Sequence, residues 1–310
     1  MKLYDEKSEK EKELKLYSLD NVKQGGNWRS VKFKHPFTFE ALAMEPGVKK
    51  EIMDDLERFI GRKEFYKKVG RAWKRGYLLY GPPGTGKSSL IAAMANHLKF
   101  DIYDLQLSSV INDSALRRLL LFTTNKSILV IEDIDCSLRL ADRQLNVSND
   151  HEADINSQIS LSGLLNFIDG LWSSCGDERI FIFTTNHKDK LDPALLRPGR
   201  MDMHIHMSYL TMPAFRVLAH NYLNILDEHH LFNEIEHLIQ TTKVSPAQVA
   251  EVLIRSDDPE ISLSSVITML KQHKLRQVEE KIDFPNLMNG GFSNGIGHDH
   301  LSSADEFSDD

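Results

Sequence analysis

The chain has 310 residues, of which 41% are hydrophobic and 27% charged, and a formal net charge of −7 at pH 7. Its length allows two packed lobes, and its composition is that of a globular protein. The negative charge argues against a general nucleic-acid-binding protein, which needs a basic footprint, so we expect no nucleic-acid partner. The two cysteines, Cys136 and Cys175, give no disulfide framework and favour a reducing compartment.

The first 35 residues begin with a charged stretch, and two short strands are expected at 14–19 and 28–34. Because two strands alone are marginally stable, we expect residues 1–35 to be part of something larger. The N-terminal stretch has no signal-peptide or transit-peptide pattern. No apolar run approaches the roughly 18–20 residues that cross a bilayer, so we predict no membrane span and a soluble intracellular chain.

Residues 36–76 lead to the first buried strand. The stretch 36–45 is expected to be irregular, and a helix is expected to begin at Pro46, a favourable first-turn residue. We interpret the basic run that follows as a solvated helix face, because clustered charge on a helix usually faces water. The run consists of Lys67, Lys68, Arg71, Lys74 and Arg75.

The strongest local signal lies at 77–95, where a strand and a helix flank a glycine-rich turn. The apolar run 77–80 predicts a buried strand, and apolar residues at helical spacing from Leu90 predict a helix. The turn has P-loop spacing, in which backbone N–H groups surround a polyphosphate, Lys87 reaches the β- and γ-phosphates, and the Ser88 hydroxyl ligates Mg²⁺. The predicted nucleotide-binding residues are Gly81, Pro82, Pro83, Gly84, Thr85, Gly86, Lys87, Ser88 and Ser89.

Strands and helices alternate from the P-loop to residue 210. Further strands are expected at 100–107, 127–135, 179–186 and 203–207, helices near 114–123 and 161–171, and a short helix and turn at 191–200. Continuous apolar runs such as 128–131 indicate strands buried on both faces, as in a parallel sheet. We therefore predict an α/β fold for residues 36–210, with a P-loop parallel sheet flanked by helices.

Polar residues follow two of these buried strands. ATP hydrolysis needs an acid that holds Mg²⁺, a group that activates water, and a contact that senses the γ-phosphate. Glu132 and Asp133 follow one strand and meet the first two needs, and Asn186 follows another and meets the third. We predict catalytic roles for Lys87, Glu132, Asp133 and Asn186, and a Mg²⁺ site formed by Ser88 and one of the two acids.

Two arginines, Arg197 and Arg200, have no acidic partner at helical or hairpin spacing. In a loop at the edge of the sheet they would face a neighbouring subunit. A guanidinium that reaches the γ-phosphate in trans can accelerate hydrolysis by roughly 10³–10⁵-fold. We therefore predict that both arginines are catalytic in trans and that the chain forms a homo-oligomeric ring.

The strand signals stop after residue 210. A helix is expected from Thr211, with Pro213 in its first turn, and three more helical segments are expected at 235–239, 246–254 and 263–274. We predict a small all-helical lid at 211–282. The tail 283–310 is rich in Gly, Asn, Ser and Asp, and we expect it to be disordered.

Taken in order, four motifs resemble the AAA ATPase family. They are Gly-Pro-Pro-Gly-Thr-Gly-Lys-Ser at 81–88, Ile-Glu-Asp-Ile-Asp at 131–135, Thr-Thr-Asn at 184–186 and Leu-Asp-Pro-Ala-Leu-Leu-Arg-Pro-Gly-Arg at 191–200. Four other stretches are closer to the cytochrome bc synthesis (Bcs-type) branch, and in particular to its plant members. These stretches are 77–80, 100–105, 131–136 and 163–170, and the resemblance covers about residues 36–275.

The resemblance implies an ATPase that uses ATP and Mg²⁺, with Asn186 as sensor 1 and Arg197 and Arg200 as arginine fingers. It also implies a hexameric or heptameric ring that acts on a protein client, which is unknown here. Relatives lie in the mitochondrial inner membrane or other membranes, and they have an N-terminal membrane anchor and a β-rich domain. The resemblance implies that residues 1–35 are the remnant of that β-rich N-terminal domain, of which they resemble only the last strands. By position, Glu132 takes the metal-side role and Asp133 the water-activating role, in the reverse of the usual Asp-Glu order.

A second departure from the family is at 108–114, which has neither the aromatic residue nor the glycine of a peptide-threading loop. We therefore expect the ring to remodel or move its partner without threading an unfolded chain. The alternative function is a nucleotide-gated assembly or signalling module with little ATP turnover. A nucleic-acid motor is a further rival, which the net charge disfavours.

Overall fold

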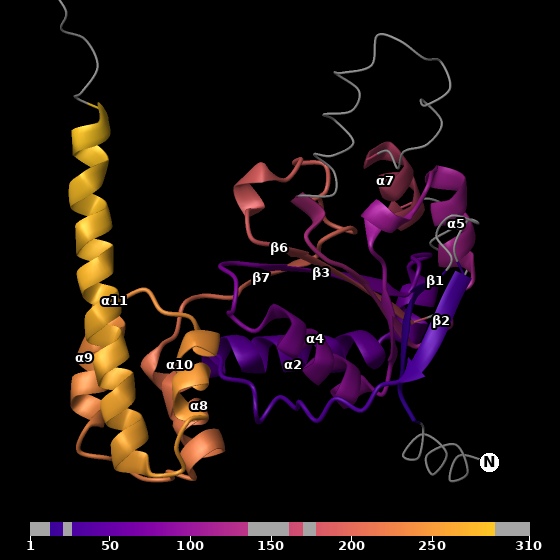
Figure 1. Cartoon of the computed structure of the whole chain (residues 1–310). Helices are drawn as coiled ribbons and strands as arrows, with labels where there is room; N and C mark the ends of the chain where they lie inside the picture. Colours follow the sequence, from indigo (N-terminus) through magenta and orange to yellow (C-terminus); the bar gives the residue numbers. More distant parts are fainter. Residues whose placement is uncertain (1–12, 21–26, 136–160, 170–177, 289–310) are drawn as a thin grey trace, which may run out of the picture.

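The computed structural model describes residues 13–20, 27–135, 161–169 and 178–288. In these ranges the chain forms an α/β lobe beside a bundle of helices (Figure 1). The lobe contains β1 (Lys15–Asp20), β2 (Asn27–Lys32), α2 (Pro46–Ile60), α3 (Lys63–Lys68), β3 (Lys74–Tyr80), α4 (Lys87–Leu98), β4 (Asp101–Asp104), α5 (Asp113–Leu121), β5 (Ser127–Ile131), α7 (Leu161–Asp169), β6 (Arg179–Thr185) and β7 (Met203–His206). The bundle contains α8 (Met212–Leu223), α9 (Phe232–Thr241), α10 (Pro246–Leu253) and α11 (Pro259–Met288).

The described strands form one sheet in the order β2-β1-β4-β5-β6-β3-β7. All neighbouring pairs are parallel except β1 and β2, which are antiparallel. The central strands β5 and β6 are buried along their whole length, which is why both read as continuous apolar runs. The predicted fold class, a parallel P-loop sheet flanked by helices with a helical lid, is confirmed.

Two apolar clusters cover the two faces of the sheet. One cluster joins α2 and α4 to one face, with Tyr77 and Val130 among its strand residues. The other joins α5 and α7 to the opposite face, with Leu78 and Leu129 among its strand residues. Neighbouring residues on a strand thus pack into the apolar clusters on opposite faces of the sheet, because successive side chains point to opposite faces. Figure 1 shows these two helix layers on either side of the strands.

The N-terminal strands extend the sheet of the α/β lobe. Leu16 and Tyr17 of β1 pair with Ile102 and Tyr103 of β4, and the Tyr17 and Tyr103 rings stack at 4.2 Å. Trp28 of β2 donates its indole N–H to a carbonyl oxygen of α5 at 2.8 Å. The two predicted strands are present. Their assignment to a separate domain of residues 1–35 stays a prediction.

The helical bundle has a core of its own, centred on residues such as Phe215, Phe232 and Leu263. Its last helix, α11, continues through residues 283–288, so the part of the predicted disordered tail next to the lid is helical. The rest of that predicted tail, 289–310, lies outside the described residues. None of the described helices combines the length and the apolar character that crossing a membrane requires.

Two predictions about this lobe are wrong. Residues 191–200 form successive turns without a helix, because Pro198 interrupts the short segment. The basic run is also not one solvated helix face. Lys74 and Arg75 begin β3 and are half-buried in ion pairs with Asp169 and Asp55, whereas Lys67, Lys68 and Arg71 are exposed.

Candidate nucleotide-binding site

The P-loop connects the end of β3 to the first residue of α4. Gly84 and Gly86 have φ angles of 76° and 93°, in the left-handed region that glycine enters without strain. This backbone lets the loop curve around the N-terminus of α4, where free N–H groups and the helix dipole attract anions. The predicted strand–loop–helix context is therefore present.

Lys87 lies at the centre of the site and donates three hydrogen bonds. Its ammonium bonds the carbonyl oxygens of Gly81 and Pro82 at 2.8 and 3.1 Å, and Oδ1 of Asn186 at 2.7 Å. Burial lowers the pKa of Lys87, and the nearby carboxylates of Asp133 and Glu132 oppose that shift. The contact joins α4 to the end of β6, although the two residues are 99 positions apart.

Ser88 and Glu132 lie next to each other, with the Ser88 hydroxyl donating to Oε1 of Glu132 at 3.2 Å. Mg²⁺ prefers oxygen ligands about 2.1 Å away in an octahedron, so two neighbouring ligands lie about 3 Å apart. The observed spacing fits that requirement. A hydroxyl and a carboxylate at this position could thus hold Mg²⁺ as the sequence predicts.

Asp133 follows β5 with its φ angle at 47°, a conformation that Asp tolerates better than most residues. Its N–H donates to Oγ1 of Thr184 at 3.1 Å, which fixes the turn against β6. The Thr185 hydroxyl donates to the buried carboxylate of Asp135 at 2.6 Å. The first of these bonds holds the backbone of Asp133, one of the two predicted catalytic acids, against the end of β6.

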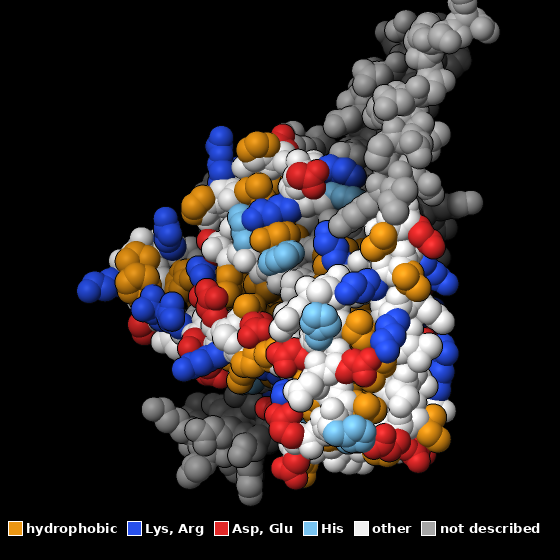
Figure 2. All heavy atoms as spheres, turned by 90° about the vertical axis from the view of Figure 1, so that its left-hand side faces the viewer, with side chains coloured by type: hydrophobic (Ala, Val, Ile, Leu, Met, Phe, Trp, Pro, Cys, Tyr) orange, Lys and Arg blue, Asp and Glu red, His pale blue; other side chains and the backbone are white. Residues whose placement is uncertain are grey.

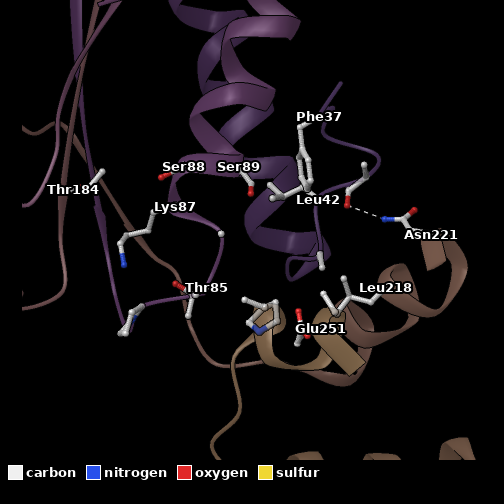
Figure 3. Close-up of a pocket in the computed structure, with 18 of the residues that line it drawn as sticks. Phe37, Leu42, Thr85, Lys87, Ser88, Ser89, Thr184, Leu218, Asn221 and Glu251 are labelled. Carbon is white, nitrogen blue, oxygen red and sulfur yellow. Dashed lines mark hydrogen bonds between the residues drawn. The ribbon is translucent and has the colours of Figure 1, made fainter. Parts of the chain in front are cut away.

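The predicted residues meet in one cavity of about 970 Å³, a size suited to a small-molecule ligand. Lys87, Ser88, Glu132, Asp133 and Asn186 all line it. Figure 3 shows the P-loop on one side and the lid residues Leu218 and Glu251 on the other. The cavity therefore lies between the two lobes and is lined by both.

Sequence reasoning missed the apolar half of this cavity. It is lined by Phe37 and Leu42 from the irregular segment before α2 and by Leu218 and Tyr222 from α8. The Asn221 side chain donates to the carbonyl oxygen of Ala41 at 2.9 Å and ties the lid to that segment (Figure 3). The one feature of the sequence that could have predicted it is the presence of apolar side chains in the irregular stretch 36–45.

The lid also contacts the P-loop directly. Ser245 and Gln248 form a capping box at the N-terminus of α10. The N–H of Ala247, in the first turn of this helix, donates to the carbonyl oxygen of Gly84 at 3.1 Å. A Cβ on Gly84 would lie 3.0 Å from Oγ of Ser245, so the glycine allows this close approach. Movement of the lid would therefore act on the loop that surrounds the phosphates.

The two predicted arginines do not line the cavity and differ from each other. Arg200 has an acidic partner far away in the sequence, because its guanidinium donates to the carboxylate of Asp169 and also to the carbonyl oxygen of Ala194. Asp169 also faces Lys74, at 3.6 Å. The Arg197 side chain is exposed and, among the described residues, makes no hydrogen bond or ion pair. Arg197 is thus the more accessible of the two to a neighbouring molecule.

Comparisons with known proteins agree with this geometry. Residues 77–209 match the family model "ATPase family associated with various cellular activities (AAA)", and residues 210–283 match "At3g28540-like, AAA+ ATPase lid domain". AAA-ATPase At5g17760 of Arabidopsis thaliana is 59% identical over 270 residues, which cover 86% of this chain and 53% of that protein. Protein HYPER-SENSITIVITY-RELATED 4, from the same plant, is 58% identical over 281 residues, covering 88% and 49%.

The chain spans about half the length of the curated relatives it matches. The matched residues include the P-loop, both strand-end motifs and the helical bundle. Family, fold and site thus agree on a nucleotide-binding lobe with a lid, and the chain belongs to the AAA ATPase family.

Proposed function

We propose that this protein is a Mg²⁺-dependent ATPase that works as a homo-oligomeric ring and remodels or moves a protein partner. The main observation in support of this proposal is that two hydrogen bonds between predicted site residues lie in the same cavity. Lys87 bonds Asn186 at 2.7 Å, and Ser88 bonds Glu132 at 3.2 Å. The residues that ATP hydrolysis needs, from three separate strand ends, therefore surround a single ligand-sized space.

Each residue has a role in this proposal. Ser88 and Glu132 hold Mg²⁺, which neutralises charge on the phosphates when it is bound. Lys87 moves its donors from the loop carbonyls to the β- and γ-phosphates. Asp133 orients and deprotonates the attacking water, and the Asn186 amide bonds that water or the γ-phosphate. The apolar half of the cavity takes the base.

We assign the trans contact to Arg197. It is exposed and lies outside the cavity of its own chain, which supports a role for its guanidinium at the site of a neighbour. Arg200 instead fastens the same turn to α7 through Asp169. A trans contact of this kind is head-to-tail, and such an interface builds a ring where its rotation closes. Bcs-type membership, which the sequence motifs favour, agrees with a ring that carries a protein client.

The closest test of the nucleotide site is Lys87→Ala. Loss of the ammonium should remove ATP turnover and weaken binding of a fluorescent ATP analogue at least about tenfold, because the phosphates lose their main cation. A matched control is Lys99→Ala, at the C-terminal end of the same helix and far from the P-loop. Unchanged turnover in Lys87→Ala would refute the site.

The alternative, a nucleotide-gated assembly module with little turnover, is favoured by one observation. Asp133 is one methylene shorter than the glutamate usual at its position, and its backbone is fixed by Thr184. Single-turnover measurements separate the two functions. A bound ATP that is hydrolysed within seconds to minutes supports the ATPase, whereas tight binding with intact ATP after hours supports the module.

A further inference from the structure

A buried acidic side chain lies next to the turn that carries Asn186. Figure 2 shows the acidic side chains of the lid face at the molecular surface, where charged groups keep their water. Asp135, in contrast, is only 5% exposed, and Thr185 beside it is fully buried. A carboxylate buried in this way is stable only when hydrogen-bond donors replace the lost water. The bonds around Asp135 therefore indicate which part of the site it supports.

The Thr185 hydroxyl joins Asp135 to the backbone that follows β6. It donates to Oδ1 of Asp135 at 2.6 Å, a short distance that is typical of a hydroxyl bonded to a carboxylate. Its oxygen accepts the N–H of His187 at 2.9 Å. This second bond closes a turn of the kind that threonine side chains form with the backbone two residues further on. One hydroxyl thus fixes the turn in which Asn186 is the middle residue.

The two bonds of this hydroxyl do not compete. A hydroxyl has a single proton, which Thr185 directs at the carboxylate of Asp135, because a carboxylate can only accept. The backbone N–H of His187 can only donate, so it bonds to a lone pair of the same oxygen. Hydrogen bonds in such a chain polarise one another, and the negative charge makes the hydroxyl a better acceptor. Asp135 therefore strengthens the bond that closes the turn.

The fixed turn presents the Asn186 side chain to the nucleotide cavity. The amide oxygen accepts the Lys87 ammonium at 2.7 Å, which leaves the amide NH₂ group to donate to a bound ligand. Neither Thr185 nor Asp135 lines the cavity. An effect of either residue on a bound nucleotide must therefore pass through a residue that does line it.

We propose that Thr185, held by the carboxylate of Asp135, is a positioning residue that fixes Asn186 for ATP hydrolysis. The inference rests on the proposed role of Asn186 as the sensor, and it names the groups that orient this side chain. A donor aimed at charge that develops in the transition state lowers the barrier most when its position is fixed in advance. Without the hydroxyl the turn loses both bonds, and the amide samples positions in which it misses the attacking water or the γ-phosphate.

The test removes the hydroxyl and asks whether Asn186 transmits the effect. Four proteins are compared with the unmodified chain: Thr185→Val, Thr185→Ser, Asn186→Ala, and the double variant Thr185→Val with Asn186→Ala. Valine keeps the shape and the β-branch of threonine, and serine keeps its hydroxyl. kcat is measured by phosphate release with saturating Mg-ATP, and affinity is measured with a fluorescent ATP analogue.

The proposal predicts that Thr185→Val lowers kcat at least about tenfold, while affinity changes by less than about threefold because Lys87 and the loop amides remain. Thr185→Ser should keep kcat within about threefold of the unmodified chain, because it retains the hydroxyl. The double variant should have the kcat of Asn186→Ala within about twofold, because a residue that acts only through the amide has no effect once the amide is gone.

The matched control is Thr123→Val, which removes a buried hydroxyl at the other end of the strands. Thr123 is 7% exposed, precedes β5 and donates to the carbonyl oxygen of Leu120 at 2.8 Å. Urea unfolding measures the stability lost in each valine variant. kcat should stay within about twofold in Thr123→Val, so a loss confined to Thr185→Val reports the turn and not the removal of a buried hydroxyl as such.

Asp135→Asn tests the same link from the other partner, and it decides the question if Thr185→Val does not fold. The amide still accepts the hydroxyl but has no charge, so it holds Thr185 less firmly. We expect kcat to fall at least about threefold. When this change is combined with Asn186→Ala, kcat should fall no further than in Asn186→Ala alone.

Two results would overturn the proposal and leave the ATPase intact. One is an unchanged kcat in both Thr185→Val and Asp135→Asn. The other is a loss in Thr185→Val that multiplies with the loss in Asn186→Ala, which would show that Thr185 acts through another residue. An Asn186→Ala protein with the kcat of the unmodified chain would refute the sensor role and the positioning with it. An unmodified chain that binds the analogue and hydrolyses no ATP would refute the proposed ATPase itself.

Discussion

The Lys87–Asn186 contact shows how single residues define the nucleotide site. Each comes from a different strand end, and the hydrogen bond of 2.7 Å places an amide beside the ammonium that would hold the phosphates. That the P-loop, the two acids and Asn186 lie around one cavity could be predicted from sequence, because each follows a buried strand whose carboxyl end must lie at one edge of the sheet. Partners across long sequence distances, such as Asp169 for Arg200, left no local signal.

Asn186→Ala tests the proposed sensor. Removing the amide should lower kcat by about 10²-fold or more, since it deletes a donor aimed at charge that develops in the transition state. Affinity for a fluorescent ATP analogue should change by less than about threefold, because Lys87 and the loop amides remain. A parallel loss of affinity, or an unchanged kcat, would contradict the role.

Substitutions of Asp133 test whether this residue, and not Glu132, activates the attacking water. Asp133→Asn should lower turnover by about 10²–10⁴-fold while ATP still binds, because the amide cannot accept the proton of the water. Asp133→Glu should keep turnover within about tenfold, since a longer carboxylate can still reach the water. Both are read by phosphate release with saturating Mg-ATP. Equal activity of all three proteins would remove Asp133 from the mechanism.

At the scale of elements, one close approach fixes the arginine turn against β3. A Cβ on Gly76 would lie 1.7 Å from the carbonyl oxygen of Arg200, and the Gly76 N–H and carbonyl both bond Asp202. Continuous apolar runs predicted the strands correctly, because these are buried on both faces. The same logic missed the turns at 191–200, whose conformation depends on contacts with β3 and α7.

Gly76→Ala should therefore lower the free energy of unfolding by about 3 kcal/mol, because backbone atoms must move to admit the methyl group. Gly47→Ala is the control, since a Cβ there meets nothing within 4 Å and lies in the first turn of α2. We expect it to change stability by less than about 1 kcal/mol. Urea unfolding measures both. Equal stability of the two variants would contradict the close approach.

A second link between elements is the buried carboxylate of Asp55 on α2. It accepts bonds from Nε and Nη2 of Arg75 at 3.0 and 2.8 Å, and from the Tyr77 hydroxyl at 2.8 Å. Burial, together with the Asp55 carboxylate, raises the pKa of Tyr77 far above its usual value. Burial alone would lower the pKa of Arg75, but the bonds to Asp55 outweigh it and raise that pKa.

Asp55→Ala should thus lower the free energy of unfolding by about 3–5 kcal/mol, because it leaves a half-buried guanidinium without its counter-charge. Tyr77→Phe should cost only about 1 kcal/mol, since Arg75 still satisfies the carboxylate. Thermal unfolding followed by circular dichroism compares the two. A Tyr77→Phe variant that loses as much stability as Asp55→Ala would show that the hydroxyl, and not the ion pair, dominates this link.

At the scale of the whole molecule, the lid lines one side of the nucleotide cavity and donates a backbone hydrogen bond to the P-loop. Composition and helical spacing predicted an all-helical C-terminal lobe, and that part of the fold is present. The face that the lid turns toward the P-loop could not be predicted, because it depends on the capping box at Ser245 and on the small residue Gly84. The proposed ring likewise depends on surfaces that only the folded chain brings together.

The central claim is that a complete active site combines Asp133 of one subunit with Arg197 of its neighbour. The most direct measurement mixes Asp133→Asn protein with Arg197→Ala protein and records the ATPase rate. Each protein alone should be inactive, and an equimolar mixture should recover about a quarter of the unmodified rate, since that share of randomly formed interfaces has both groups intact. A mixture that stays inactive, or an Arg197→Ala protein that is fully active alone, would contradict the account.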